Sequence, residues 1–217
     1  MFCRKSLLLL RQKSRKMSDY TIEDKILKRM KKTKRGLVFF AVDFAAYGNA
    51  KACNKALERL TKQEKIIRVG RGIYALPRKS KYFGRVSSSI EEIARGIARR
   101  DKARLIPTGL FAENLLGLST QVPMKIVYLT DGTPRKMIFD KTPLIFKKTS
   151  LKNAATYGKI STLVIQALKS IRKDRVTDDE IKKVVEILKK ENPKYLAHDI
   201  KLAPEWIREI MRKAQTS

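Results

Sequence analysis

Apolar and polar positions follow two different periods along the first third of the chain. Ile22, Ile26 and Met30 recur at the three-to-four-residue spacing that puts side chains on one face of a helix, which predicts a helix over residues 21–32. Residues 37–40 are all apolar and predict a short strand. The chain therefore begins its folded part with a helix followed by a strand.

A helix-turn-helix is predicted next. Residues 41–47 have the composition of a short helix, and Gly48 follows at the position where a left-handed C-cap is expected. Asn49 is a favoured N-cap residue in front of a second helix, residues 50–62. Apolar residues occupy one face of that helix, and the opposite face is polar and mostly basic.

A glycine-rich turn then joins two short apolar segments. Residues 66–69 and 73–76 are β-branched and aromatic, and Gly70, Arg71 and Gly72 lie between them, which predicts a β-hairpin. The two glycines lack the remainder of a phosphate-loop motif. Helix, strand, two helices and hairpin in this order predict a winged helix-turn-helix.

The overall prediction is an α+β chain: an N-terminal winged helix-turn-helix, then an α+β domain with a small antiparallel sheet and C-terminal helices. Residues 78–89 are polar and predict a linker or long loop. Helices are predicted over residues 90–100, 110–116 and 161–172, from 181 onward and from 204 onward; strands are predicted over 124–129, 135–139 and 143–147. The expected divisions are a winged helix over 18–82, an α+β domain over 83–150 and a helical region packed on it over 151–217.

Residues 1–17 resemble a signal peptide only superficially. The leucine run covers residues 7–10, short of the apolar core that such a peptide needs, and basic residues follow at once. We expect a disordered basic extension or a start at Met17 instead of Met1. The sequence has no apolar stretch long enough to predict a membrane span.

Charge points to the class of partner. The chain has 50 Lys and Arg residues against 21 Asp and Glu, a net charge of +29 and a pI near 10.3. The excess is present in both halves of the chain, which favours a polyanionic partner over a single charged tail. A solvated basic surface without a nucleic-acid partner is the alternative.

The polar face of helix 50–62 and the hairpin carry the candidate contacts. Asn54 could recognise an adenine edge, and the lysines could hold phosphates or guanine. Arg71 at the hairpin tip could reach a flanking minor groove or a phosphate. The predicted DNA-binding residues are Asn49, Lys51, Asn54, Lys55, Lys62, Arg68, Arg71 and Lys79.

The chain resembles a known family over roughly residues 20–150. Two segments carry the resemblance: the winged-helix pattern that ends in Arg71, Gly72, Ile73 and Tyr74, and the segment 113–123, which places Leu118, Gln121 and Pro123 ahead of a strand. Both are similar to AbiEi-type antitoxins, regulators of type IV toxin–antitoxin abortive-infection systems.

This resemblance implies a regulator that binds inverted repeats in its own promoter and represses its operon. The scarcity of cysteines fits a reducing cytoplasm, and a monomer or homodimer is expected. It also implies opposition to a nucleotidyltransferase-type toxin without a stable complex. A stand-alone winged-helix regulator without a toxin remains an alternative.

An enzyme is not predicted, and neither a cofactor nor a metal is expected. Cys3 and Cys53 are too few for a disulfide framework or a zinc site, and Cys53 is expected to be a small buried residue. His198, the sole histidine, is expected at the surface or in packing. Asp131 and Asp140 could form a carboxylate pair, but a turn and a strand end explain them equally well.

An RNA- or ribosome-associated protein is a further alternative. It would need exposed aromatic rings on which bases stack. The aromatic residues of the N-terminal region are spaced like core residues instead, which favours DNA; they are Phe39, Phe40, Phe44, Tyr47 and Tyr74.

Overall fold

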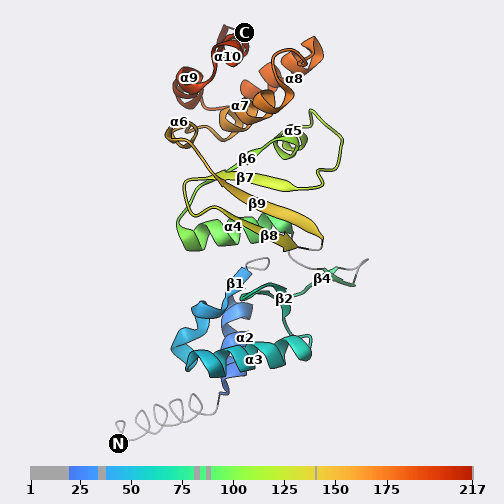
Figure 1. Cartoon of the computed structure of the whole chain (residues 1–217), viewed down its shortest axis with the longest axis vertical. Helices are drawn as coiled ribbons and strands as arrows, with labels where there is room; N and C mark the ends of the chain where they lie inside the picture. Colours follow the sequence, from blue (N-terminus) through green and yellow to red (C-terminus); the bar gives the residue numbers. More distant parts are fainter. Residues whose placement is uncertain (1–19, 34–37, 81–83, 87–88, 140, 217) are drawn as a thin grey trace, which may run out of the picture. The chain divides into compact units, whose positions relative to one another are not determined.

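The computed structural model describes residues 20–33, 38–80, 84–86, 89–139 and 141–216 (Figure 1). The chain divides into two compact units, Met1–Gly96 and Ile97–Ser217. The predicted α+β fold class is confirmed. Within the described residues, no helix is both long and apolar enough to cross a membrane.

Unit 1 begins with α2 (Ile22–Lys32), whose start is fixed by a capping box. The Asp24 backbone N–H donates to Thr21 Oγ1 at 3.2 Å, and the Thr21 backbone N–H donates to Asp24 Oδ2 at 3.2 Å. β1 (Val38–Phe40) and the 3-10 helix η1 (Ala41–Tyr47) follow.

α3 (Ala50–Lys62) has the predicted bounds. Asn49 caps it, because its side-chain oxygen accepts from the Ala52 backbone N–H at 2.8 Å. Gly48 differs from the prediction: its φ of 163° and ψ of −178° are extended, not left-handed. The extended backbone at Gly48 leads into Asn49, which caps α3. A Cβ on Gly48 would lie only 3.0 Å from Ile22 Cδ1, so a glycine fits here because there is little room for a side chain.

The hairpin forms as predicted from β2 (Ile67–Gly70) and β3 (Ile73–Ala75). β3 also pairs antiparallel with β1, which gives a three-stranded sheet of order β1-β3-β2. The register shifts between Arg68 and Gly70, and Gly72 has a φ of +70°, which a glycine adopts without strain.

One core holds unit 1 together. It joins α2, β1, η1, α3 and β3, and Phe39, Phe44 and Tyr74 belong to it as expected. Phe40 is also buried, and Tyr47 packs against the cluster with part of its surface exposed. Cys53 is 2% exposed, so its prediction as a small buried residue is confirmed.

The segment predicted as a linker contains a second hairpin. β4 (Arg78–Ser80) and β5 (Gly84–Val86) pair antiparallel. The prediction of a linker or loop over 78–89 was wrong for the residues that form these strands. Their polar composition indicates only that the side chains face water, and two strands can pair through backbone hydrogen bonds without apolar side chains. α4 (Ile90–Asp101) follows and crosses the division between the units.

Unit 2 contains a four-stranded sheet built from β6 (Leu105–Thr108), β7 (Ile126–Thr130), β8 (Arg135–Phe139) and β9 (Thr142–Lys148). The strand order is β6-β7-β9-β8; β7 and β9 are parallel and the other pairs antiparallel. The three predicted strands are present. β6 was not predicted, because Pro107 weakens the strand pattern; the structure places it on an edge strand, where a missing N–H is tolerated.

The helices of unit 2 gather into a second core (Figure 1). The core residues come from α5 (Leu110–Leu115), α7 (Lys159–Ile171), α8 (Asp178–Leu188), α9 (Pro193–Leu202) and α10 (Glu205–Thr216) and from the segments beside them, whereas the short α6 (Leu151–Ala154) has no buried residue. α7 is the central helix: it contacts α5, α8, α9 and β6. Thr177 and Glu180 form the predicted capping box of α8.

Candidate nucleic-acid interface

The outward face of α3 collects four of the predicted contacts. Lys51, Asn54, Lys55 and Lys62 are all exposed, while Cys53, Ala56, Leu57 and Leu60 of the same helix are buried. The 3.6-residue period separates the two sets, so burial of the apolar set fixes which side chains face water. The sequence prediction of a polar, mostly basic helix face is therefore confirmed.

Two lysines of this face are unpaired within the described part of the chain. No ion pair joins Lys51 or Lys55 to a described carboxylate. Arg59 differs, because its Nη1 lies 3.3 Å from Glu23 Oε1 and so ties α3 to α2. Lys51 and Lys55 are thus available to an external anion, and Arg59 serves the packing of two helices.

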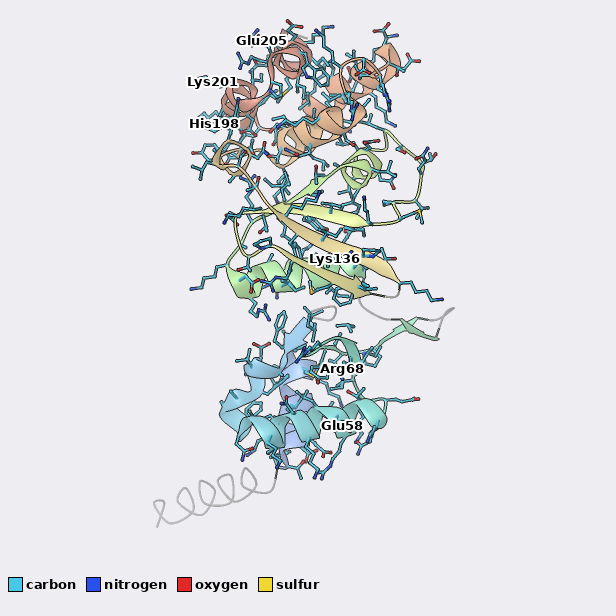
Figure 2. The ribbon with its side chains drawn as sticks, viewed as in Figure 1. Glu58, Arg68, Lys136, His198, Lys201 and Glu205 are labelled. Atoms are coloured by element: carbon cyan, nitrogen blue, oxygen red, sulfur yellow. The ribbon has the colours of Figure 1, made fainter. Side chains whose placement is uncertain are left out.

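An acid interrupts the basic face. Glu58 Oε1 lies 2.9 Å from Lys62 Nζ, one turn along α3 (Glu58 is labelled in Figure 2). The hydrogen bond and the positive charge of Lys62 lower the pKa of Glu58 below its ordinary value, so this carboxylate is ionised at neutral pH. Lys62 is therefore partly neutralised before any ligand arrives.

The sequence predicts Asn49 both as the N-cap of α3 and as a DNA contact, and the structure shows that its side-chain oxygen serves the cap. Because Oδ1 accepts from the Ala52 backbone N–H, only the amide NH₂ remains for a ligand. Asn49 is thus a helix cap first. Asn54, in contrast, is exposed, and no hydrogen bond occupies its side chain among the described residues.

The remaining predicted contacts lie on the hairpins. Arg68 on β2 and Arg71 in the turn after it are exposed. Arg68 Nε donates to the Gly70 carbonyl at 3.4 Å, which holds its guanidinium along the hairpin, whereas Arg71 has no such tether among the described residues (Arg68 is labelled in Figure 2). Lys79 lies on β4, and its side chain is outside the described part of the structure.

The helix-turn-helix is braced by contacts between its elements. The Cys53 thiol donates to the Phe44 carbonyl at 3.3 Å, and Arg29 Nη1 donates to the Asp43 carbonyl at 2.5 Å. The Ala41 backbone N–H donates to the Gly72 carbonyl at 3.0 Å, which joins the start of η1 to the turn of the β2–β3 hairpin. α2, η1, α3 and the hairpin thus form one cross-linked support for the polar face.

Sequence reasoning missed a polar network in unit 2 that centres on Asp199. This carboxylate is fully buried and accepts the backbone N–H groups of Tyr157 and Gly158, both at 2.8 Å. It also accepts the Ser161 hydroxyl, and His198 Nδ1 lies 3.0 Å from its Oδ1. The spacing of Leu196, Asp199, Ile200 and Ala203 on one helical stripe was the signal that could have revealed it.

A second acid caps the same turn. Glu191 Oε2 accepts the backbone N–H groups of Ile160 and Ser161, at 2.7 and 3.1 Å, and so occupies the N-terminus of α7. A Cβ on Gly158 would come within 2.5 Å of that same oxygen and within 2.3 Å of Ser161 Oγ. A glycine at this position lets both carboxylates approach the helix start.

Serine, histidine and aspartate in contact invite comparison with a hydrolase triad, but the connectivity differs. In a triad the histidine lies between the serine and the carboxylate. Here the carboxylate lies between the other two, and Ser161 is fully buried. The arrangement anchors a turn and has no exposed nucleophile.

The structure does not test the carboxylate pair considered from the sequence. Asp131 Oδ1 accepts the Arg104 backbone N–H at 2.8 Å, and Asp140 lies outside the described residues. Over the part of the chain that the structure describes, no group of three or more His, Cys, Asp or Glu side chains could hold a metal ion.

Comparisons with other proteins place the chain in a family without assigning it an activity. The model of DUF6088, a family of unknown function, matches residues 25–196. No curated protein matches the sequence. The crystal structure of RV2827C protein from Mycobacterium tuberculosis is similar at a TM-score of 0.46 and 12% identity, covering 88% of this chain and 81% of that one, a likeness too distant to carry an argument.

Proposed function

Because the chain belongs to DUF6088, a family of unknown function, its activity has to be argued from its own residues, and we propose that unit 1 binds double-stranded DNA as a winged helix. The observation that carries this proposal is the exposed face of α3, on which neither Lys51 nor Lys55 forms an ion pair with a described carboxylate. A helix of this kind fits the major groove of DNA, and lysine ammonium groups suit its phosphates.

Supporting arguments come from the hairpin and from the charge. In the proposed complex the β2–β3 hairpin is the wing, and Arg71 at its turn extends toward a flanking phosphate or minor groove. A net charge of +29 supplies long-range attraction to a polyanion. The aromatic residues Phe39, Phe40, Phe44 and Tyr74 are buried, so they offer no stacking surface to RNA in unit 1.

Different side chains have different roles in this proposal. Lys51 and Lys55 hold phosphates and contribute affinity on any duplex, whereas Asn54 reads a base edge and contributes sequence preference. The proposal includes no catalytic step, and its setting is the cytoplasm, where an operator would be found.

The test is binding of the full chain to duplexes, including its own upstream DNA, by fluorescence anisotropy at several salt concentrations. If about six phosphates are neutralised, affinity falls about a thousandfold between 50 and 200 mM salt. The variant K51A/K55A should lower affinity for every duplex and reduce the salt slope by about two. Asn54→Ala should chiefly reduce the preference for the operator over an unrelated duplex.

Lys31→Ala provides a matched control, since Lys31 is an exposed lysine on α2 with the same charge and no place in the proposed interface. Equal binding by wild type, K51A/K55A and Lys31→Ala would refute the assignment to α3. Lys31→Ala removes one charge where K51A/K55A removes two, so a loss of about half the size (in free energy) from Lys31→Ala would mean that only total charge matters.

Opposition to a nucleotidyltransferase-type toxin stays a prediction from the resemblance to AbiEi-type antitoxins. Neither the geometry nor the charge adds support to that second role. Co-expression with any nucleotidyltransferase encoded beside the gene tests it directly: rescue of growth supports an antitoxin, and the absence of such a neighbour favours a stand-alone regulator.

A further inference from the structure

An aromatic cluster lies exposed on unit 2. Tyr157 is 62% exposed and Tyr195 is 47% exposed, and their ring centroids are 6.2 Å apart in an edge-to-face arrangement. The His198 ring stacks on Tyr157 at 4.1 Å with an interplanar angle of 20°. Single exposed apolar side chains are common at protein surfaces, whereas aromatic rings gathered into one exposed patch often mark an interaction site.

The cluster is held in place from below. The buried Asp199 carboxylate accepts the Tyr157 backbone N–H and contacts His198 Nδ1 at 3.0 Å, so one group fixes the backbone beneath one ring and the orientation of another. Rings fixed in this way lose little freedom on binding a ligand.

Three lysines lie near the rings along the chain. Lys194 and Lys201 lie four residues before and three residues after His198 on α9, so helical spacing puts them on the same side of that helix (His198 and Lys201 are labelled in Figure 2). Lys159 begins α7, two residues after Tyr157. All three are exposed, and none forms an ion pair with a described residue.

A pocket adjoins Tyr157 on unit 2. Its volume is about 510 Å³, within the range of small-ligand sites. Apolar side chains from β6 and α7 line it together with polar ones; Tyr157, Lys159, Arg104, Ile106 and Leu163 are among the lining residues. Arg104 is itself engaged with the Ala154 and Thr156 carbonyls and so forms a fixed wall.

We propose that this surface binds unpaired nucleotides of a single-stranded nucleic acid, RNA or DNA. A base stacks on the tyrosine and histidine rings, the lysines hold the phosphates on either side, and the pocket accepts an adjacent base. Aromatic rings beside cationic groups are the usual chemistry of single-strand recognition. A duplex hides its bases, so this site and the α3 face bind different forms of nucleic acid.

The experiment uses the full chain carrying K51A/K55A, which removes the proposed duplex interface without touching unit 2. Labelled single strands of one sequence, as RNA and as DNA, are titrated by fluorescence anisotropy. Adding Tyr157→Ala should weaken binding by about 5- to 100-fold, the range for loss of one stacked base. Tyr157→Phe keeps the ring and should bind like its parent.

Two controls separate stacking from folding and from charge. Tyr20→Ala removes a tyrosine of unit 1 that is 43% exposed and should leave single-strand affinity unchanged. Lys194→Ala should weaken binding more than Lys173→Ala, which removes an exposed lysine beyond α7. Circular dichroism checks that each variant is folded.

Equal losses for RNA and DNA support stacking alone, and a larger loss for RNA supports an added contact to the 2′-hydroxyl. The proposal is overturned if the K51A/K55A chain binds neither strand, or if Tyr157→Ala binds both as tightly as its parent. Either result leaves the duplex proposal standing, because that proposal is measured on duplexes with residues of unit 1.

Discussion

Glu58 and Lys62 form an ion pair of 2.9 Å on the exposed face of α3, at the C-terminal end of the helix face proposed to meet DNA. The pair is expected to weaken DNA binding in two ways. It neutralises part of the positive charge of Lys62, and it places a negative charge where phosphates would approach.

Glu58→Gln should therefore strengthen duplex binding. The change removes repulsion from phosphates and frees Lys62, with an expected gain of about two- to fivefold at moderate salt, the size typical of an exposed charge pair. Anisotropy with a fixed duplex measures it. Glu209→Gln, an exposed acid on α10, is the control and should change affinity little. Weaker binding by Glu58→Gln would show that the ion pair orients Lys62 for contact.

Asn49 offers a second prediction, because its cap and its proposed DNA contact can be separated. Asn49→Ala removes the acceptor for the Ala52 N–H and should destabilise unit 1 by about 1 kcal/mol. Asn49→Ser keeps an acceptor and should be nearly as stable as wild type, yet it lacks the amide donor. Far-UV circular dichroism gives the stability.

The fluorescence of Trp206, the sole tryptophan, reports on unit 2 and should not change in either Asn49 variant. Duplex affinity decides the second role. If Asn49→Ser binds like wild type, Asn49 is only a cap; if it binds more weakly at equal stability, the amide contacts DNA.

The sequence predicted unit 1 better than unit 2 because the determinants of unit 1 are local. Asn49 at the start of α3, and the apolar stripe behind it, define the helix and its outward face without reference to distant residues. The extended conformation of Gly48 and the β4–β5 hairpin were missed, since both depend on what neighbouring segments require.

In unit 2 the informative contacts join residues far apart in the chain. Tyr157 and His198 are separated by 41 positions yet stack, and nothing in the local pattern around either predicts the other. α9 was not predicted either, because Asp199 and the lysines around it disguise an apolar stripe. Burial of that aspartate is compensated by donors from residues 157–161, which only the folded chain brings together.

A third prediction concerns pH and the capping box of α2. Hydrogen bonds from the Thr21 side chain and then its backbone lower the pKa of Asp24 from the ordinary value of 3.8. A carboxylate with a lowered pKa in the folded state stabilises the fold above its unfolded pKa, and this contribution is lost as the pH falls through the folded pKa.

Asp24→Asn should accordingly be less stable than wild type at neutral pH, and the difference should shrink below about pH 4. Thermal melts of both proteins, followed by circular dichroism across this range, provide the measurement. Asp174→Asn, an exposed acid of unit 2, serves as the control. A constant gap between the Asp24→Asn and wild-type melting curves at all pH values would refute the linkage.

The last prediction tests the buried carboxylate beneath the aromatic cluster. Asp199 accepts two backbone N–H groups and a hydroxyl, and His198 Nδ1 lies 3.0 Å from Oδ1, the oxygen that accepts from Tyr157. Asn in its place keeps the shape but turns an NH₂ toward at least one of these donors, which leaves a buried N–H unsatisfied. Asp199→Asn should therefore destabilise unit 2 by about 3 kcal/mol.

Urea unfolding followed by Trp206 fluorescence measures this loss within unit 2. Asp174→Asn removes an acid whose nearest ion pair, with Arg175, spans 4.0 Å at the surface, and it should shift the midpoint by little. A midpoint for Asp199→Asn equal to that of wild type would mean that the carboxylate does not anchor the turn at residues 157–161. The support proposed for the Tyr157 ring would then have to come from packing alone.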